Sequence, residues 1–243
     1  MSDTPPLCAA PDPSPRAPQV TVPDGATDCH FHIFDGPSPQ IAERSYTAPP
    51  APLDAFRHLH TTLRISRSVI VQPSVYGTDN RTTLAACDTT PQMRAIVVVD
   101  EDTPPSTLAA YRKRGAVGCR VNMLFGSNAR IDSLSSLAGR IADQGWHLQI
   151  LGDVSALGDR MDEFASLPVP VVFDHFGHLQ AIRGINDPGF RGLLRLLGSG
   201  AAWVKLSGAY RLGPAGAQTD RAVADLAAAL IAAHPDQIVC GSG

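Results

Sequence analysis

The sequence alternates short apolar runs with longer segments of helical pattern, and this alternation constrains the fold more than any other feature. Eight strand-like runs occupy residues 26–34, 68–73, 94–100, 116–122, 147–151, 169–175, 202–208 and 237–242. Seven segments with helical spacing separate them, at residues 53–64, 78–88, 104–115, 132–145, 154–167, 187–200 and 219–234. This alternation is typical of an α/β protein with a buried parallel sheet. Eight strands in a chain of 243 residues favour a (β/α)8 TIM barrel over an open doubly wound sheet.

The predicted barrel has a proline-rich segment before it and ends with the last residue of the sequence. Residues 1–23 are rich in proline and poor in apolar side chains. We expect a flexible arm there, because too little apolar surface is available to offset the entropy of ordering. Residues 24–243 are expected to form a single barrel domain. The sequence stops at Gly243 without the helix expected after the eighth strand, so we expect a barrel that is incomplete at its C-terminus.

Composition excludes several classes of partner. The formal net charge is −3 and no basic excess points to a nucleic acid, while no apolar run is long enough to span a membrane. No secretory signal is recognisable, and neither of the glycine-rich nucleotide-binding patterns GxGxxG and GxxxxGK[ST] occurs where it would be needed. The five cysteines are widely spaced and odd in number, which argues against a disulfide framework. We therefore expect a cytoplasmic protein whose partner is a small molecule, with an oligomeric state that the sequence leaves open.

Two histidines stand one residue apart in the first strand, within the stretch DCHFHIFD at residues 28–35. In a regular strand Asp28, His30 and His32 share one face, which we expect to point into the barrel, while Phe31 lies on the face that packs against the outer helices. Neutral imidazole is a metal ligand, and barrel enzymes keep their chemistry at the carboxyl ends of the strands. The pair therefore predicts a catalytic or metal-binding site, with a satisfied pair of core histidines as the alternative.

Several motifs together resemble the amidohydrolase-2 family of the amidohydrolase superfamily. They are DCHFHIFD on the first strand, FDHFGH on the sixth, VKLSGAY on the seventh and IVCGS on the eighth, in this order and at barrel spacing. The segments YTAPP, VIVQPS, YGTDN and GCRVN resemble the lactonase branch of that family, which includes the 2-pyrone-4,6-dicarboxylate hydrolases. The resemblance extends from about residue 23 to the end of the sequence.

The resemblance implies roles for individual side chains. His30, His32 and His175 match the family's histidines of the first and sixth strands and are the predicted catalytic residues. They would hold one divalent metal ion, zinc or manganese, or would act without a metal as donors to a developing oxyanion. The predicted substrate-binding residues are Arg120, Arg211, Ser74, Tyr46 and Gln72. For His175 the alternative is a structural histidine, and for the others it is an ordinary surface position.

The implied activity is hydrolysis of a small organic-acid lactone by attack of water on the ring carbonyl, with a 2-pyrone-dicarboxylate-like or a sugar-acid lactone as substrate. The family's eighth strand ends in an aspartate that activates this water, and Gly243 stands at that position here. Glycine cannot accept a proton, so we expect this chain to have reduced activity. Two alternatives stay open: a metal-dependent decarboxylase of the same superfamily, and a barrel that binds an organic acid without catalysis.

Overall fold

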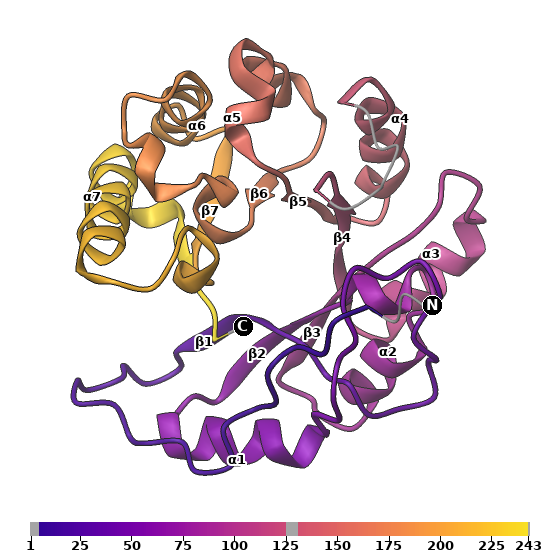
Figure 1. Cartoon of the computed structure of the whole chain (residues 1–243). Coiled ribbons are helices and arrows are strands. Elements are labelled where there is room, and N and C mark those ends of the chain that lie inside the picture. Colours follow the sequence, from indigo (N-terminus) through magenta and orange to yellow (C-terminus); the bar gives the residue numbers. More distant parts are fainter. Residues whose placement is uncertain (1–4, 125–130, 243) are drawn as a thin grey trace. The chain divides into compact units, whose positions relative to one another are not determined.

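The computed structural model describes residues 5–124 and 131–242, apart from the side chains of residues 131 and 132. Eight strands lie at the positions that the sequence predicts (Figure 1). They are β1 (Thr27–Phe31), β2 (Arg67–Val71), β3 (Met93–Val97), β4 (Ala116–Asn122), β5 (His147–Leu151), β6 (Val171–Phe173), β7 (Ala202–Leu206) and β8 (Ile238–Cys240). Gly243, the position of the predicted loss of the water-activating carboxylate, lies outside the described residues.

A helix follows each of the first seven strands. The helices are α1 (Leu53–Leu63), α2 (Arg81–Asp88), α3 (Pro105–Lys113), α4 (Ile131–Ala142), α5 (Val154–Leu157), α6 (Pro188–Gly198) and α7 (Ala217–Ala233). The strands form one sheet in the order β1 to β8. The pairs β1–β2, β2–β3, β4–β5, β5–β6, β6–β7 and β7–β8 are parallel. Sequential order with alternating helices is the topology of a (β/α)8 barrel, so the predicted fold class is confirmed.

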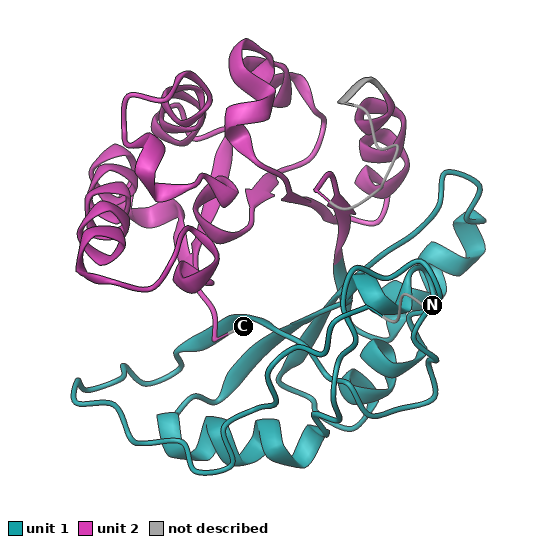
Figure 2. Ribbon diagram, in the orientation of Figure 1, with its two compact units in different colours: residues 1–117 teal, residues 118–243 magenta. Residues whose placement is uncertain are grey.

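The chain divides into two compact units, residues 1–117 and residues 118–243 (Figure 2). In unit 1 the apolar face of α1 packs on β1, where the ring of Phe56 stacks on that of Phe31 with centroids 3.5 Å apart. Ile70, Val71 and Ile96 of the neighbouring strands are fully buried. Their β-branched side chains supply the close-packed core on which the carboxyl ends of β1 and β2 are held.

Within unit 1, main-chain hydrogen bonds attach the N-terminal segment to the loop after β1. Leu7 forms an isolated parallel bridge with Thr47. The amide of Cys8 donates to the Thr47 carbonyl at 2.9 Å, and the Thr47 amide donates to the Pro6 carbonyl at 2.8 Å. The flexibility expected of residues 1–23 stays a prediction, but these bonds attach residues 6–8 to the loop after β1.

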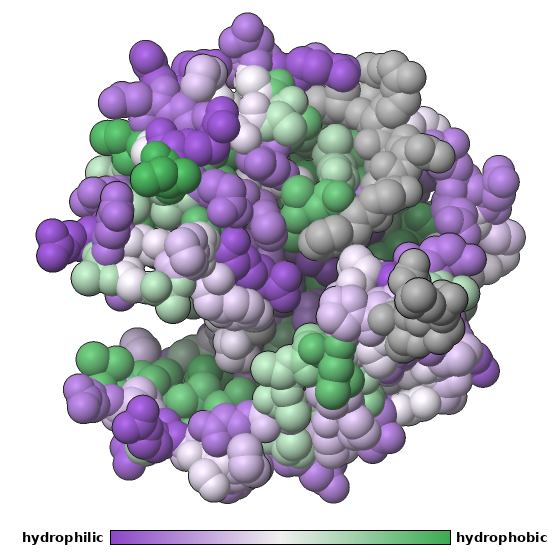
Figure 3. Space-filling model, in the orientation of Figure 1, coloured by the Kyte–Doolittle hydropathy of each residue, from purple (hydrophilic) through white to green (hydrophobic). Residues whose placement is uncertain are grey.

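Unit 2 has its own core between its strands and helices. Phe173 of β6 meets Phe164 edge to face at 5.1 Å, and Phe190 and Leu193 of α6 are fully buried against this layer. Hydrophilic residues cover most of the visible surface over α5 (Figure 3). Within the part of the chain that the structure describes, every helix is too short or too polar to cross a membrane.

Candidate functional site

His30 of β1 and His32, just after that strand, have ring nitrogens in contact. His30 is fully buried, and its Nε2 lies 3.3 Å from Nε2 of His32, with the rings nearly perpendicular. His32 is half-buried, and its Nδ1 lies 2.8 Å from the carbonyl oxygen of Val71 in β2. A carbonyl oxygen only accepts, so Nδ1 of His32 carries a proton and the lone pair of the neutral ring is on Nε2, facing His30.

This arrangement fits a metal ion. Two nitrogens bound to one tetrahedral zinc at roughly 2.0–2.1 Å lie about 3.3–3.4 Å apart. The observed separation of 3.3 Å matches that value. A ligand histidine also commonly donates its other ring N–H to a carbonyl, as His32 does to Val71. Alternatively, Nε2–H of His30 donates to Nε2 of His32, and the pair is then an ordinary hydrogen bond.

The predicted orientation of Asp28 is wrong. Its carboxylate does not share the face of the histidines but contacts His60 of α1, with Oδ2 3.1 Å from Nε2 of His60. The strand register explains the difference: Asp28 pairs with Ser68 and Phe31 with Ile70, so three steps along β1 match two along β2. This β-bulge breaks the alternation of faces and turns both Asp28 and Phe31 toward α1.

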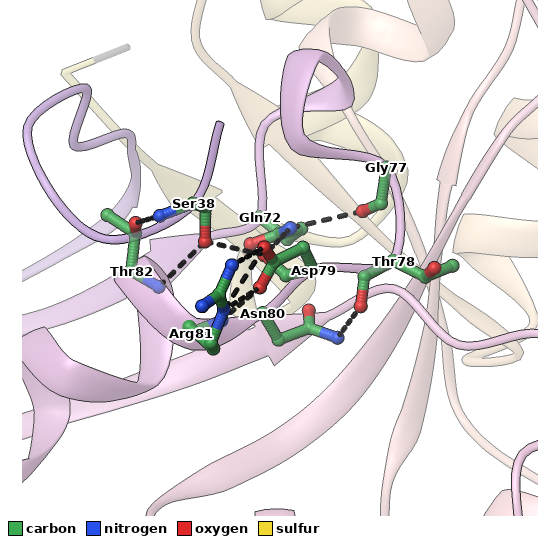
Figure 4. A network of polar contacts seen from close by, with 8 residues as sticks. All are labelled: Ser38, Gln72, Gly77, Thr78, Asp79, Asn80, Arg81 and Thr82. Atoms are coloured by element: carbon green, nitrogen blue, oxygen red, sulfur yellow. Dashed lines mark hydrogen bonds and ion pairs between the residues drawn. The ribbon is translucent and has the colours of Figure 1, made fainter. Parts of the chain in front are cut away.

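Gln72 lies at the carboxyl end of β2 and is enclosed by the loop that follows it (Figure 4). Its side-chain amide donates to the carbonyls of Gly77 and Asp79, each at 3.0 Å. The hydroxyl of Thr83 donates to its Oε1 at 2.5 Å. Because both amide protons are engaged, these contacts favour a structural role for Gln72 in shaping the loop. Its predicted contact with substrate stays a prediction.

Ser74 and Tyr46 lie near the same end of unit 1. Ser74 begins the 3₁₀ turn Ser74–Tyr76 and is half-buried. The ring of Tyr46 is half-buried and meets the Phe34 ring edge to face at 6.4 Å. Tyr76 was not predicted. Its ring lies 6.2 Å from Phe34, and burial raises its pKa, with Asp35, Tyr46 and Asp79 adding to the shift.

In unit 2, Asp174 is the centre of a buried polar cluster. This fully buried carboxylate follows β6 and accepts hydrogen bonds from Nε of Arg120 at 3.1 Å and from Nε2 of Gln149 at 3.0 Å. The ammonium of Lys205 lies 3.4 Å from its other oxygen and donates to Oε1 of Gln149 at 2.7 Å. Adjacent parallel strands supply these groups, and Arg120 is the register partner of Gln149. Arg120 therefore lies buried in an ion pair rather than on the surface.

His175 is the next residue along the chain and is also buried. Its Nδ1 lies 2.9 Å from the hydroxyl of Ser207. Gly208 follows that serine with φ of 62°, and a Cβ there would lie 2.7 Å from Nδ1 of His175. Only glycine lets the backbone come this close to the ring, which accounts for the glycine in the sequence SGAY.

Burial lowers the pKa of His175 to about 4. Asp174 opposes this shift, whereas the cations Arg120, Arg211 and Lys205 add to it. The ring is therefore neutral at pH 7, as a metal ligand must be. Arg211 itself is exposed in the 3₁₀ turn Ala209–Arg211, with its guanidinium 5.3 Å from the centre of the Tyr210 ring.

The predicted site residues thus fall into two groups, one in each unit. His30 and His32 are in contact within unit 1, while His175 is adjacent to the ion pair of Arg120 and Asp174 within unit 2. No prediction from the sequence included Gln149, Lys205 or Ser207. A lysine and a glutamine inside otherwise apolar strands were the available signal, because such side chains are rarely buried without a partner.

Comparisons with known proteins agree with this description. The chain is 30% identical to a 4-sulfomuconolactone hydrolase of Hydrogenophaga intermedia, over 98% of this chain and 80% of that protein. It is 30% identical to a 2-pyrone-4,6-dicarboxylate hydrolase of Comamonas testosteroni, over 94% of this chain and 79% of that protein.

Among solved structures, a probable 2-pyrone-4,6-dicarboxylic acid hydrolase of Acinetobacter baumannii, determined with citric acid bound, superimposes with a TM-score of 0.82. The two sequences are 26% identical, and the match covers 90% of this chain and 83% of that one. Residues 27–243 match the family described as Amidohydrolase. On this match, which takes in nearly the whole sequence, the chain belongs to the amidohydrolase family.

Proposed function

We propose that this protein hydrolyses a lactone of a small organic acid by attack of water on the ring carbonyl. The observation that carries the proposal is the pair of Nε2 atoms of His30 and His32, 3.3 Å apart, with Nδ1 of His32 held by Val71. The relatives support the reaction class, since two of them are named as hydrolases of a lactone and of a pyrone.

The two groups of site residues would act together at the carboxyl ends of the barrel strands. His30 lies near the end of β1, His32 follows β1 and His175 follows β6, so all three belong to the end of the sheet where barrel enzymes place their active sites. We infer that His175 completes a three-histidine set with the pair at the end of β1. The neutral state of His175 and the lone pair of His32 support this inference.

The histidines can serve the reaction in two ways. A divalent ion bound by them, zinc or manganese, would polarise the lactone carbonyl and lower the pKa of a water molecule. Without an ion, the imidazoles of the three histidines would act as hydrogen-bond donors to the negative charge that develops on the carbonyl oxygen. In either case the hydroxyl of Ser207 contacts Nδ1 of His175 and orients its ring.

Arginine would recognise the acid group of the substrate. A guanidinium binds both oxygens of a carboxylate, and Arg120 and Arg211 flank the segment that carries His175. The citric acid bound to the Acinetobacter baumannii neighbour supports a site that accepts small carboxylates. Ser74 and Tyr46 would add hydrogen bonds from unit 1.

A cytoplasmic location, which agrees with a small-molecule substrate, stays a prediction.

The test is a hydrolysis assay on a panel of lactones: a 2-pyrone dicarboxylate, a muconolactone and a saturated sugar-acid lactone. We expect ring opening of at least one of them, with a rate that falls at least about 100-fold in His32→Gln. Assays with added zinc, added manganese and chelator decide between the two uses of the histidines. The expected loss caused by Gly243 is typically 10²–10⁴-fold, and His32→Gln adds about 100-fold, so the assay must detect rates about 10⁶-fold below those of an efficient hydrolase.

Absence of ring opening for the whole panel in folded protein would contradict the proposal. Release of carbon dioxide from an aromatic acid would instead indicate the decarboxylase. Tight binding of a panel member without turnover would indicate the non-catalytic alternative.

A further inference from the structure

The bulge in β1 lies directly at the histidine pair. One extra residue of β1 is inserted between the pairs Asp28 with Ser68 and Phe31 with Ile70, and His30 belongs to that insertion. Bulges commonly redirect a side chain next to an active site. Here the altered backbone determines where the ring of His30 points, and therefore whether its Nε2 can approach that of His32.

The carboxylate of Asp28 holds this bulge from within the strand. Its Oδ1 accepts the amide N–H of His30 at 3.0 Å, an interaction two residues along the chain that resembles an Asx turn. The side chain is 2% exposed, so solvent offers no substitute for its hydrogen bonds. Losing the carboxylate would leave the amide of His30 without this acceptor.

The other oxygen of Asp28 is held by α1. Oδ2 lies 3.1 Å from Nε2 of His60, which is 8% exposed. The His60 ring lies against Phe56 with centroids 3.9 Å apart. The His60 carbonyl accepts the amides of Arg64 and Ile65, so its backbone is fixed in the last turn of the helix. An ionised carboxylate only accepts, so Nε2 of His60 is the donor to Asp28.

We propose that His60 and Asp28 form a positioning pair, through which α1 sets the bulge and keeps Nε2 of His30 within 3.3 Å of Nε2 of His32. The proposal rests on the proposed function only in assigning those two nitrogens to a metal ion or an oxyanion. In this proposal His60 and the side chain of Asp28 act through the backbone of His30. The pair differs from the usual support of a ligand histidine, which contacts the ring rather than the main chain.

Three variants separate positioning from packing. His60→Leu removes the donor to Asp28 and keeps an apolar side chain on α1. His60→Gln keeps an N–H donor. Phe56→Leu disturbs the packing on Phe31 and on His60, with centroids 3.5 Å and 3.9 Å away, but removes neither hydrogen-bonding group of the polar pair. The free energy of unfolding of each variant is measured in urea, so that a loss of stability common to His60→Leu and Phe56→Leu is recognised as packing.

The decisive measurement is the long-range ¹H–¹⁵N spectrum of the imidazole rings in metal-free protein, with His30 and His32 assigned from His30→Gln and His32→Gln. We expect the ring signals of His30 and His32 to shift in His60→Leu, to return toward wild type in His60→Gln, and to stay unchanged in Phe56→Leu. Unchanged signals in His60→Leu, or equal changes in His60→Leu and Phe56→Leu, would overturn the proposal. This readout requires neither a metal nor a substrate, so it is independent of the test of the proposed function.

Zinc affinity measured by calorimetry adds a second readout if the wild type binds the ion. We expect zinc to bind about 10-fold more weakly to His60→Leu, at the lower end of the range for indirect supports of metal ligands, and to bind His60→Gln and Phe56→Leu nearly as the wild type does. Equal affinity of the wild type and His60→Leu would contradict the positioning role.

Discussion

In unit 2, the pKa of His175 is well below the ordinary value for an imidazole. The ring is buried beside an ion pair, and three cations act on it together with one carboxylate. Protonating it would place another positive charge next to Arg120 and Lys205 in a poorly solvated environment. The protein therefore keeps this imidazole neutral, and the cost of charging it is coupled to folding.

Stability should consequently depend on pH through His175. Its pKa is about 4 in the folded protein, against the ordinary value of 6.5 for a solvated imidazole, so between these values the unfolded chain binds the extra proton. The free energy of unfolding is therefore highest above pH 6.5 and falls as the pH drops toward 4, by about 3 kcal/mol from this group. Urea titrations of wild type and His175→Asn from about pH 7.5 to 4, both with chelator present, measure the difference. A parallel pH dependence of the two proteins would contradict this assignment.

Individual side chains differ in how far the sequence predicts their place. The positions of His30, His32 and Arg120 in or beside barrel strands were foreseeable from the apolar runs around them, whereas their roles stay predictions. The direction of Asp28 was not, because a bulge depends on the register with β2, which a single strand does not encode. The pairing of Arg120 with Asp174 also depended on contacts between residues 54 positions apart in the chain.

The turn after β6 has an uncommon backbone conformation. Four consecutive residues, His175 to His178, have positive φ, and three of them are not glycine. Left-handed conformations cost L-residues roughly 1–2 kcal/mol each, so the surrounding packing must impose them. Gly177 lies at the tightest point of the turn, where a Cβ would approach Val154 to 2.6 Å and Leu193 to 2.9 Å.

We expect Gly177→Ala to destabilise the protein by more than its backbone angle alone explains. Gly145→Ala is the matched control, because Gly145 has φ of 67° against 65° for Gly177 but has no atom within 4 Å of the added Cβ. Gly145 follows α4 in a left-handed turn, where its amide donates to Ala142 and that of Trp146 donates to Ile141. Both variants incur about 1 kcal/mol from the left-handed conformation, and overpacking adds roughly 1–3 kcal/mol to Gly177→Ala alone. Urea unfolding of both variants gives this difference, and equal losses of stability would show that the turn relaxes without cost.

The elements themselves were largely predictable, since all eight strands and seven helices lie where the apolar patterns indicated. The clearest departure is the predicted helix at 154–167. There α5 ends at Leu157 and a 3₁₀ segment, Gly158–Ser166, follows. Gly158 has φ of 50°, which a continuing α-helix does not allow. Periodicity alone does not distinguish α from 3₁₀ geometry over such a short segment.

For the whole molecule, the boundary between the two units falls within a single strand. Val117 ends unit 1 and Gly118 begins unit 2, and both belong to β4. On one side the amide of Ala95 donates to the carbonyl of Gly115 at 3.0 Å. On the other, residues 118–122 pair in register with 147–151 of β5. Because both sets of hydrogen bonds hold the same strand, loss of one set would loosen the residues that form the other. We therefore expect the two units to unfold together.

We therefore expect unfolding in urea to be one cooperative transition despite the division of contacts into two units. Both tryptophans, Trp146 and Trp203, belong to unit 2, so their fluorescence reports on that unit, whereas far-UV circular dichroism reports on the helices of both. Coincident midpoints and slopes are expected for the two signals. A control variant, Tyr111→Trp in α3, adds a fluorescent reporter to unit 1 and should follow the same curve. If α3 melted at a lower urea concentration than the tryptophans of unit 2, β4 would not couple the two units, and stability would then have to be measured for each unit separately.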